Sequence, residues 1–94
     1  MGVAFGIFYH ELVVKKDIPK LSAVYRARIK SAIEAKLVYN PEVFGKPLRR
    51  SLHGYRKLRV GDYRVIFRTE KDKVKIFYIG HRSVAYGETQ KRFR

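Results

Sequence analysis

Residues 54–68, which read Gly-Tyr-Arg-Lys-Leu-Arg-Val-Gly-Asp-Tyr-Arg-Val-Ile-Phe-Arg, decide the fold of this chain. Two stretches of alternating side chains flank Gly61-Asp62, and this pattern predicts a β-hairpin with a two-residue turn. With such a turn, Arg59 lies directly opposite Arg64. Like charges that face each other across a pair of strands destabilise the pair. A hairpin that keeps two arginines there indicates a surface that faces an anion.

The alternation also divides the hairpin into two faces. Leu58 and Val60 lie on one face, which is the apolar one. The other face carries a row of cations formed by Lys57, Arg59, Arg64 and Arg68. The strand that follows the hairpin runs out into Gly80-His81-Arg82, with Tyr86 close behind. A histidine, a further arginine and a tyrosine are thus added at the end of a strand.

Length and composition describe one folded unit. A chain of 94 residues supports a single domain, taken as residues 1–94. Its content of 46% hydrophobic and 14% aromatic residues is ordinary for a globular domain and argues against disorder. The chain has no cysteine, which excludes disulfides and thiolate metal sites, and its eight acidic residues are scattered. We therefore expect neither a metal ion nor another cofactor.

The charge is concentrated in the second half of the chain. The formal net charge is +14, of which residues 1–45 carry +3 (seven Lys/Arg against four Asp/Glu) and residues 46–94 carry +11 (fifteen against four). Such a field favours polyanions such as nucleic acid, an acidic protein or an anionic membrane. The apolar residues 2–9 are too short to span a bilayer and lack the charged lead of a signal peptide. We therefore expect no membrane partner and a cytoplasmic location.

Hydrophobic periodicity predicts the order of the elements. Apolar residues recur at helical spacing from Leu21 to Leu37, with Pro19 suited to a first helical position and Asn40-Pro41 ending the helix. Residues 41–53 are expected to form a loop. The other predicted elements are a strand over 3–9, a short helix over 10–16, and strands over 55–60, 63–70 and 73–80.

This order, β-α-α-β-β-β, predicts an α+β domain of two layers, with two helices on one face of a mostly antiparallel sheet of four strands. The opposite face is expected to be open. Phe77 and Ile79 fall on that face, which indicates that it is partly covered or that the register shifts by one residue. Residues 83–94 form a short C-terminal segment that is either helical or irregular.

The element order, together with residues 57–64 and the stretch from Gly80-His81-Arg82 to Tyr86, resembles the RelE/ParE toxin superfamily of prokaryotic toxin–antitoxin systems. It looks most like the RelE branch, over nearly the whole chain. The resemblance implies a RelE-like fold and a ribosome-dependent mRNA endonuclease that cleaves codons in the ribosomal A site. It implies as partners mRNA, the ribosome with its 16S rRNA, and an acidic cognate antitoxin.

The resemblance also assigns site residues. The family positions that bind and cut RNA fall on Lys57, Arg59, Arg64, Arg82 and Tyr86. RNA-binding roles are predicted for the arginines along and before the hairpin, Arg49, Arg50, Arg56, Arg59 and Arg68. Two departures from the family pattern concern catalysis. Tyr55 stands where some members carry a further lysine, and residues 49–52 offer no glutamate of the kind that others use as general base.

The remaining groups suffice for cleavage by the 2′-hydroxyl of RNA itself, which requires a base, cations for the phosphorane and a proton donor for the leaving oxygen, but no metal ion. Tyr86 is the candidate base, provided that neighbouring cations stabilise its phenolate. Arg64 and Arg82 are the candidate phosphate clamps, because a guanidinium fork matches two phosphoryl oxygens. His81 is a second candidate, as the acid. The products are then a 2′,3′-cyclic phosphate and a 5′-hydroxyl.

Other interpretations of the same residues stay open. Arg59 and Arg64 could form a solvated face, Arg82 could pair with Glu70 or Glu88, and Tyr86 could pack the tail onto the sheet. At the level of function, the alternatives are a ParE-like inhibitor of DNA gyrase, which shares the fold, and a non-catalytic RNA-binding module, for which the charge alone suffices.

Overall fold

The structure is a computed structural model that describes residues 4–93. Val3, the predicted start of the first strand, lies outside these residues. The elements follow in the order β1 (Gly6–Tyr9), η1 (Val13–Asp17), α1 (Ile18–Lys20), α2 (Ala23–Ala32), η2 (Ile33–Leu37), α3 (Pro41–Phe44), β2 (Lys46–Pro47), η3 (Arg50–Leu52), β3 (Arg56–Val60), β4 (Tyr63–Glu70), β5 (Lys73–His81) and α4 (Ala85–Arg92). The segments η1 and η2 are π-helical turns that continue their neighbouring helices, and η3 is a 3-10 turn.

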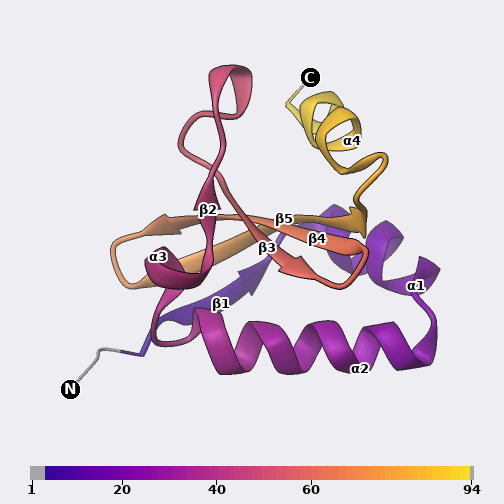
Figure 1. The fold of residues 1–94 in the computed structure, drawn as a ribbon, viewed down its shortest axis with the longest axis horizontal. Helices are drawn as coiled ribbons and strands as arrows, with labels where there is room; N and C mark the ends of the chain where they lie inside the picture. The colour runs from indigo at the N-terminus through magenta and orange to yellow at the C-terminus, as the bar shows by residue number, and fades with distance from the viewer. Residues whose placement is uncertain (1–3, 94) are drawn as a thin grey trace.

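Figure 1 shows the strands as one sheet, in the order β1-β5-β4-β3-β2. Strand β1 is parallel to β5, and the other three pairings are antiparallel. The prediction of an α+β domain with a mostly antiparallel sheet is therefore confirmed. The sheet has a fifth strand because Lys46–Pro47, in the predicted loop, pairs with the start of β3. Two residues show no alternation, so the sequence pattern could not reveal this strand.

The first helical layer covers one face of the sheet, where α2 lies along its full width in Figure 1. The Ser22 side chain accepts a hydrogen bond from the backbone N–H of Tyr25 at 3.2 Å and so caps α2. The long helix therefore begins after Ser22 and not at Pro19, which belongs to the preceding turn α1. Ile29 and Leu37 are buried against the sheet, as the helical spacing predicted.

A β-bulge in β5 changes which side chains face this layer. Ile66 pairs with Tyr78, whereas Phe67 pairs with Ile76, so Phe77 is left without a partner in the ladder. One extra residue reverses the alternation beyond it. Ile76 and Ile79 consequently both lie in the core beneath the helices. Of the two alternatives that the sequence left open for Phe77 and Ile79, the shift of register is therefore present for Ile79.

Helix α4 covers part of the other face, which lies opposite α2 in Figure 1. Ala85 packs there against Ile66 and Tyr78 in a second, smaller core. At the far end of α4, Arg92 pairs with Asp17 through Nη2–Oδ1 at 2.5 Å and Nη1–Oδ2 at 2.8 Å, and both side chains are buried. The face expected to be open is therefore partly covered, which was one of the alternatives, because the C-terminal segment is a helix fixed to the sheet.

Candidate functional site

The hairpin β3–β4 sets out the cations of the site as its sequence pattern predicted. Arg59 pairs with Arg64 in register, and Gly61 occupies the turn with a φ of +58°, a left-handed conformation that suits glycine. Strand β2 extends the row because Lys46 pairs with Lys57. Lys46, Lys57, Arg59 and Arg64 line a shallow hollow of about 120 Å³ together with Phe44. Four cations around one small hollow form an anion-binding surface.

Arg64 forms the floor of this surface. Its side chain is buried, with 8% of the residue exposed, and its Nη1 donates to the carbonyl oxygens of Gly61 at 3.0 Å and Tyr63 at 2.9 Å. The prediction of an exposed cation is therefore wrong for Arg64. The two hydrogen bonds fix the guanidinium group at the turn and leave its other nitrogens without a hydrogen bond to the described residues. A fork held in this way is preorganised for a phosphate.

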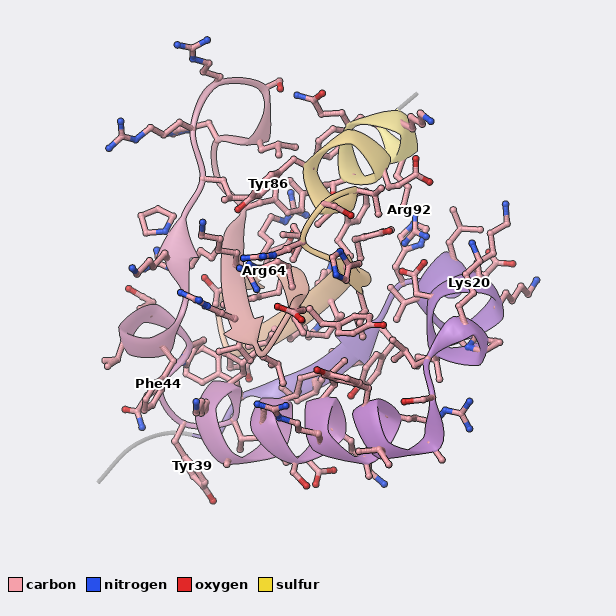
Figure 2. The ribbon with its side chains drawn as sticks, turned by 45° about the vertical axis from the view of Figure 1, so that its right-hand side comes forward. Lys20, Tyr39, Phe44, Arg64, Tyr86 and Arg92 are labelled. Atoms are coloured by element: carbon pink, nitrogen blue, oxygen red, sulfur yellow. The ribbon has the colours of Figure 1, made fainter. Side chains whose placement is uncertain are left out.

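Tyr86 comes to the same surface from α4. Its hydroxyl accepts a hydrogen bond from Lys57 Nζ at 2.8 Å, and the same nitrogen lies 5.5 Å from the centre of its ring. Figure 2 shows Tyr86 and Arg64 on the side of the sheet that faces away from α2. Tyr86 is 38% exposed, so its ring is accessible to solvent in part. The contact brings the ammonium of Lys57 to the phenol oxygen of Tyr86, beside the hollow that Arg64 lines.

Arg82 stands at the edge of the site, directly after β5. Its backbone N–H donates to the carbonyl oxygen of Asp62 at 2.8 Å, and its Nε lies 3.9 Å from the Asp62 carboxylate. The pairings considered from sequence do not form. Glu70 is hydrogen-bonded to Lys75 and to Arg68, and these contacts lower the pKa of its carboxyl group. Glu88 is hydrogen-bonded to Lys91, which lowers the pKa of that carboxyl group in the same way. Arg82 is 58% exposed and remains available for an anionic ligand.

His81, the last residue of β5, is exposed. Its Nδ1 accepts a hydrogen bond from the backbone N–H of Ser83 at 3.2 Å and lies 2.8 Å from the Ser83 hydroxyl. The ring also meets the edge of Tyr63 with centroids 5.7 Å apart. His81 is thus held by local contacts, and Tyr63, its partner in the ladder, lies at the edge of the core that the helices cover.

The arginines predicted to bind RNA fall into two groups. Arg49 and Arg50 are exposed at the loop before β3, and Arg59 is exposed on the hairpin. The other two have partners within the protein. Arg56 donates to the backbone carbonyls of Gly45 at 3.1 Å and Glu42 at 2.9 Å, and Arg68 pairs with Glu70 and covers the Tyr55 ring at 5.5 Å. Arg56 therefore holds the loop that carries Lys46.

The sequence pattern did not reveal two further contributions to the site. Lys46 joins the hollow only because β2 pairs with β3, and the surrounding Gly45 and Pro47 read as loop residues. The Asp17–Arg92 pair joins residues 75 positions apart and holds α4, which carries Tyr86. No local pattern links such distant residues. In the sequence, Asp17 appears only as a residue that precedes a helix. In the structure, its carboxylate also accepts a hydrogen bond from the backbone N–H of Ile79 at 3.0 Å.

Metal ligands and membrane spans give no further site in the part of the chain that the structure describes. Residues 4–93 hold no group of three or more His, Asp or Glu side chains placed to bind a metal ion. None of the helices within those residues has the length and apolar character needed to cross a membrane. The site is therefore described by its cations and by Tyr86.

Comparison with known proteins places this chain in a family. The family model described as "ParE toxin of type II toxin-antitoxin system, parDE" matches residues 9–86. Toxin RelE of Mycobacterium tuberculosis is 34% identical over 73 residues, which cover 76% of this chain and 75% of that protein.

Solved structures agree with this placement. The match to the toxin–antitoxin complex RelBE2 from M. tuberculosis has a TM-score of 0.78 and 28% identity, and it covers 84% of this chain and 99% of the matched chain. A mutant of E. coli toxin RelE in the free state shares the fold, with a TM-score of 0.71 and 24% identity over 97% of this chain and 99% of that one. The chain therefore belongs to the ParE toxin family of type II toxin–antitoxin systems and is a toxin of the RelBE type.

Proposed function

We propose that this toxin is a ribosome-dependent mRNA endonuclease that cuts codons in the ribosomal A site. The observation that carries the proposal is the contact of Lys57 Nζ with the Tyr86 hydroxyl at 2.8 Å, beside the hollow that Arg64 lines. It combines a group that can accept a proton with cations that can hold a phosphate. The names of the relatives, Toxin RelE and RelBE2, support the same activity by resemblance.

The proposed reaction uses the nucleophile that RNA carries. The phenolate of Tyr86, stabilised by Lys57, takes the proton from the 2′-hydroxyl, whose oxygen attacks the adjacent phosphorus. The bond to the 5′-oxygen breaks, and that oxygen takes a proton from water, because His81, the donor considered from sequence, lies against Tyr63 on the helical side of the sheet. The products are a 2′,3′-cyclic phosphate and a 5′-hydroxyl. This displacement needs no metal ion, because no water molecule has to be activated.

The arginines stabilise the charge that develops on the phosphorus. Arg64 is fixed by its bonds to the turn, so little reorganisation is needed when the phosphorane forms. Arg82, with 58% of its side chain exposed, is accessible to the phosphate of the bound RNA. In this proposal the ribosome orients the codon, which allows weak acid and base groups to suffice.

The partners follow from charge. Residues 46–94 carry a net +11, which suits mRNA and 16S rRNA. It also suits an acidic antitoxin that folds on binding, and the RelBE2 and RelB–RelE complexes are toxins solved with an antitoxin. We expect unaccompanied expression to arrest growth and translation, and co-expression of the antitoxin to relieve both. Undisturbed translation in cells that make the protein alone would contradict the toxin activity proposed.

A second candidate function is inhibition of DNA gyrase, which the name of the matched family model keeps open. It is disfavoured by the Lys57–Tyr86 contact beside Arg64, because an inhibitor that acts by binding alone needs no such arrangement. A third candidate, RNA binding without catalysis, needs only the charge.

One experiment separates the three. Purified protein is added to ribosomes that translate a defined mRNA, the A-site cut is mapped by toe-printing, and the new ends are tested for a 2′,3′-cyclic phosphate. Cuts that appear only with translating ribosomes support the proposal. RNA binding without cuts would favour the third candidate, and arrest of gyrase supercoiling without cuts would favour the second.

A further inference from the structure

A second hollow lies on the face that carries the Lys57–Tyr86 contact, at the end of the sheet where β1 pairs with β5. Its volume is about 240 Å³, and we call it the aromatic hollow after the residues that line it, Phe8, His10, Tyr55 and Phe77, with Arg68 and Lys75 at its rim. The proposed reaction does not use this concentration of rings. Aromatic side chains next to cations on an open sheet face are the means by which many proteins bind single-stranded nucleic acid.

The rings that form the hollow are held rigidly. The Phe77 ring stacks on Phe93 with centroids 5.2 Å apart and an interplanar angle of 21°, while His10 and Tyr55 meet it at 5.1 Å and 5.2 Å. The bulge at Phe77 turns this side chain away from the main core and onto this face. Phe8, on the opposite wall, is 50% exposed. A large ring left half in water beside a preformed hollow is a surface on which a flat ligand can stack.

The charges at the hollow suit a polyanion. Lys73 Nζ lies 5.6 Å from the centre of the Phe8 ring, and the guanidinium carbon of Arg68 lies 5.5 Å from that of Tyr55. With Lys75 there are three cations, against the one carboxylate of Glu70, which pairs with Arg68 and Lys75. The net charge therefore stays positive at the rim. The rings below the rim supply apolar contact for a base, which contacts to phosphate groups alone do not provide.

The hollow also lies near the proposed cleavage site, along the same two strands. Tyr55 lies two residues before Lys57 on the same side of its strand, and Arg68 lies four residues after Arg64, separations of about 7 Å and about 13 Å along the sheet. At about 3.4 Å per stacked nucleotide, one RNA strand covers this range in about two to four nucleotides. A strand held by its phosphate at Arg64 can therefore place a neighbouring base in the hollow.

From this geometry we propose that the aromatic hollow binds an unpaired nucleobase of the RNA strand that is cut, two to four nucleotides from the scissile phosphate. The inference rests on the proposed endonuclease function for the identity of that strand. To the endonuclease function the inference adds a base-stacking subsite, which would orient the RNA along β3 and β4. Phe8, which is half-exposed at the hollow, is the residue to which we assign the stacking contact.

Binding of a short RNA tests the subsite without ribosomes. The probe is a fluorescent octanucleotide with 2′-O-methyl groups, which cannot be cut, and its Kd is measured by anisotropy. Phe8→Ala is expected to raise this Kd about fivefold to a hundredfold, the loss found when one stacked base is removed. A dinucleotide, whose two bases both adjoin its single phosphate, is too short to reach from Arg64 to the hollow and should bind both proteins equally. Phe8→Leu, which keeps apolar volume but removes the ring, should behave like Phe8→Ala.

Tyr39→Ala is the matched control, since Tyr39 is an aromatic residue with 55% exposure that points away from the sheet in Figure 2. It should leave the Kd within about twofold. A series of octanucleotides with one abasic position then locates the base. The abasic site that weakens binding to the parent protein should have no further effect on Phe8→Ala, because both changes remove the same contact.

The outcomes are distinct from those of the endonuclease test. If the parent protein fails to cut mRNA but the Phe8 and abasic losses coincide, the subsite stands and the endonuclease proposal fails. If the parent cuts mRNA and Phe8→Ala binds every octanucleotide as tightly as the parent does, the subsite is wrong. If Phe8→Ala loses binding to an acidic peptide while its RNA affinity stays unchanged, the hollow belongs to a protein partner and the inference is overturned.

Discussion

Among single residues, Lys57 and Tyr86 form the contact on which the proposed chemistry depends. They lie 29 positions apart, one on β3 and one on α4, and their side chains meet at 2.8 Å. A tyrosine hydroxyl becomes a useful base when a neighbouring positive charge stabilises its deprotonated form. The contact can be removed without disturbing the core, because Tyr86 is exposed.

Tyr86→Phe should reduce ribosome-dependent cleavage by roughly a hundredfold or more, because the ring stays and only the proton acceptor is lost. The measurement is the single-turnover rate on ribosomes programmed with a defined A-site codon. Tyr39→Phe is the control, since it removes an exposed hydroxyl on the helical side of the molecule. Normal cleavage by Tyr86→Phe, with loss of cleavage in His81→Ala, would mean that the roles of the two residues are inverted.

Lys57→Met tests whether the two residues act as a unit. The substitution keeps most of the apolar stem and removes the ammonium that donates to Tyr86. The double variant with Tyr86→Phe should cut little more slowly than the slower single variant, since each change disables the same device. Rates that multiply would show instead that Lys57 acts on the RNA independently of Tyr86.

Substitution of Arg64 and substitution of Arg82 should change the free energy of unfolding by different amounts, although both residues are proposed phosphate ligands. Arg64→Ala removes two hydrogen bonds from the turn at a buried position and should lower the free energy of unfolding by about 1–3 kcal/mol. Arg82 is exposed, so Arg82→Ala should change it by no more than about 0.5 kcal/mol. Urea denaturation gives both values, and cleavage should be lost in both variants. Full activity in the stable Arg82→Ala protein would remove it from the site.

At the scale of elements, α4 is the part of the site most dependent on distant contacts. Its first turn packs through Ala85, and its last turn is held by Arg92, which also donates to the carbonyl oxygen of Phe77 at 2.8 Å. Arg92 lies over the Tyr78 ring at 4.7 Å, and burial is the largest cause of the raised pKa of that phenol. The helix is thus fixed at both ends, which sets where Tyr86 stands.

Arg92→Ala should lower the free energy of unfolding by about 3–5 kcal/mol, because it leaves the Asp17 carboxylate buried without its charged partner. Urea denaturation followed by circular dichroism measures the loss. The double variant Asp17→Asn with Arg92→Met should be more stable than Arg92→Ala, since no buried charge is left unpaired. A double variant as unstable as Arg92→Ala would show that the pair itself, and not the unpaired charge, supplies the stability.

The sequence predicted those elements whose pattern is local. Alternation and a two-residue turn placed Arg59 opposite Arg64, and helical spacing placed Ile29 and Leu37 in the core. The strand Lys46–Pro47 is too short to show alternation, and the Asp17–Arg92 pair depends on the fold as a whole. The burial of Arg64 could not be foreseen either, because it depends on the turn carbonyls.

At the scale of the whole molecule, the uneven charge should make RNA binding steeply dependent on salt. The logarithm of the binding constant should fall linearly with the logarithm of the salt concentration. Replacing Arg49 and Arg50 by Ala should reduce the slope by about one for each arginine that contacts a phosphate. The control is Lys30→Ala, an exposed cation on the helical layer, which should leave the slope unchanged. Equal effects of all three residues would indicate a diffuse field and no defined path for the RNA.

The parallel pairing of β1 with β5 has a consequence for the order of folding. Strands β3, β4 and β5 are joined by tight turns and can form early, whereas Gly6 must find Lys73 across a long loop. The Asp17–Arg92 pair likewise joins distant parts of the chain. We therefore expect the cations of the hairpin to assemble before Tyr86 is positioned. A molecule folded only that far would attract RNA but would lack the group proposed to cut it.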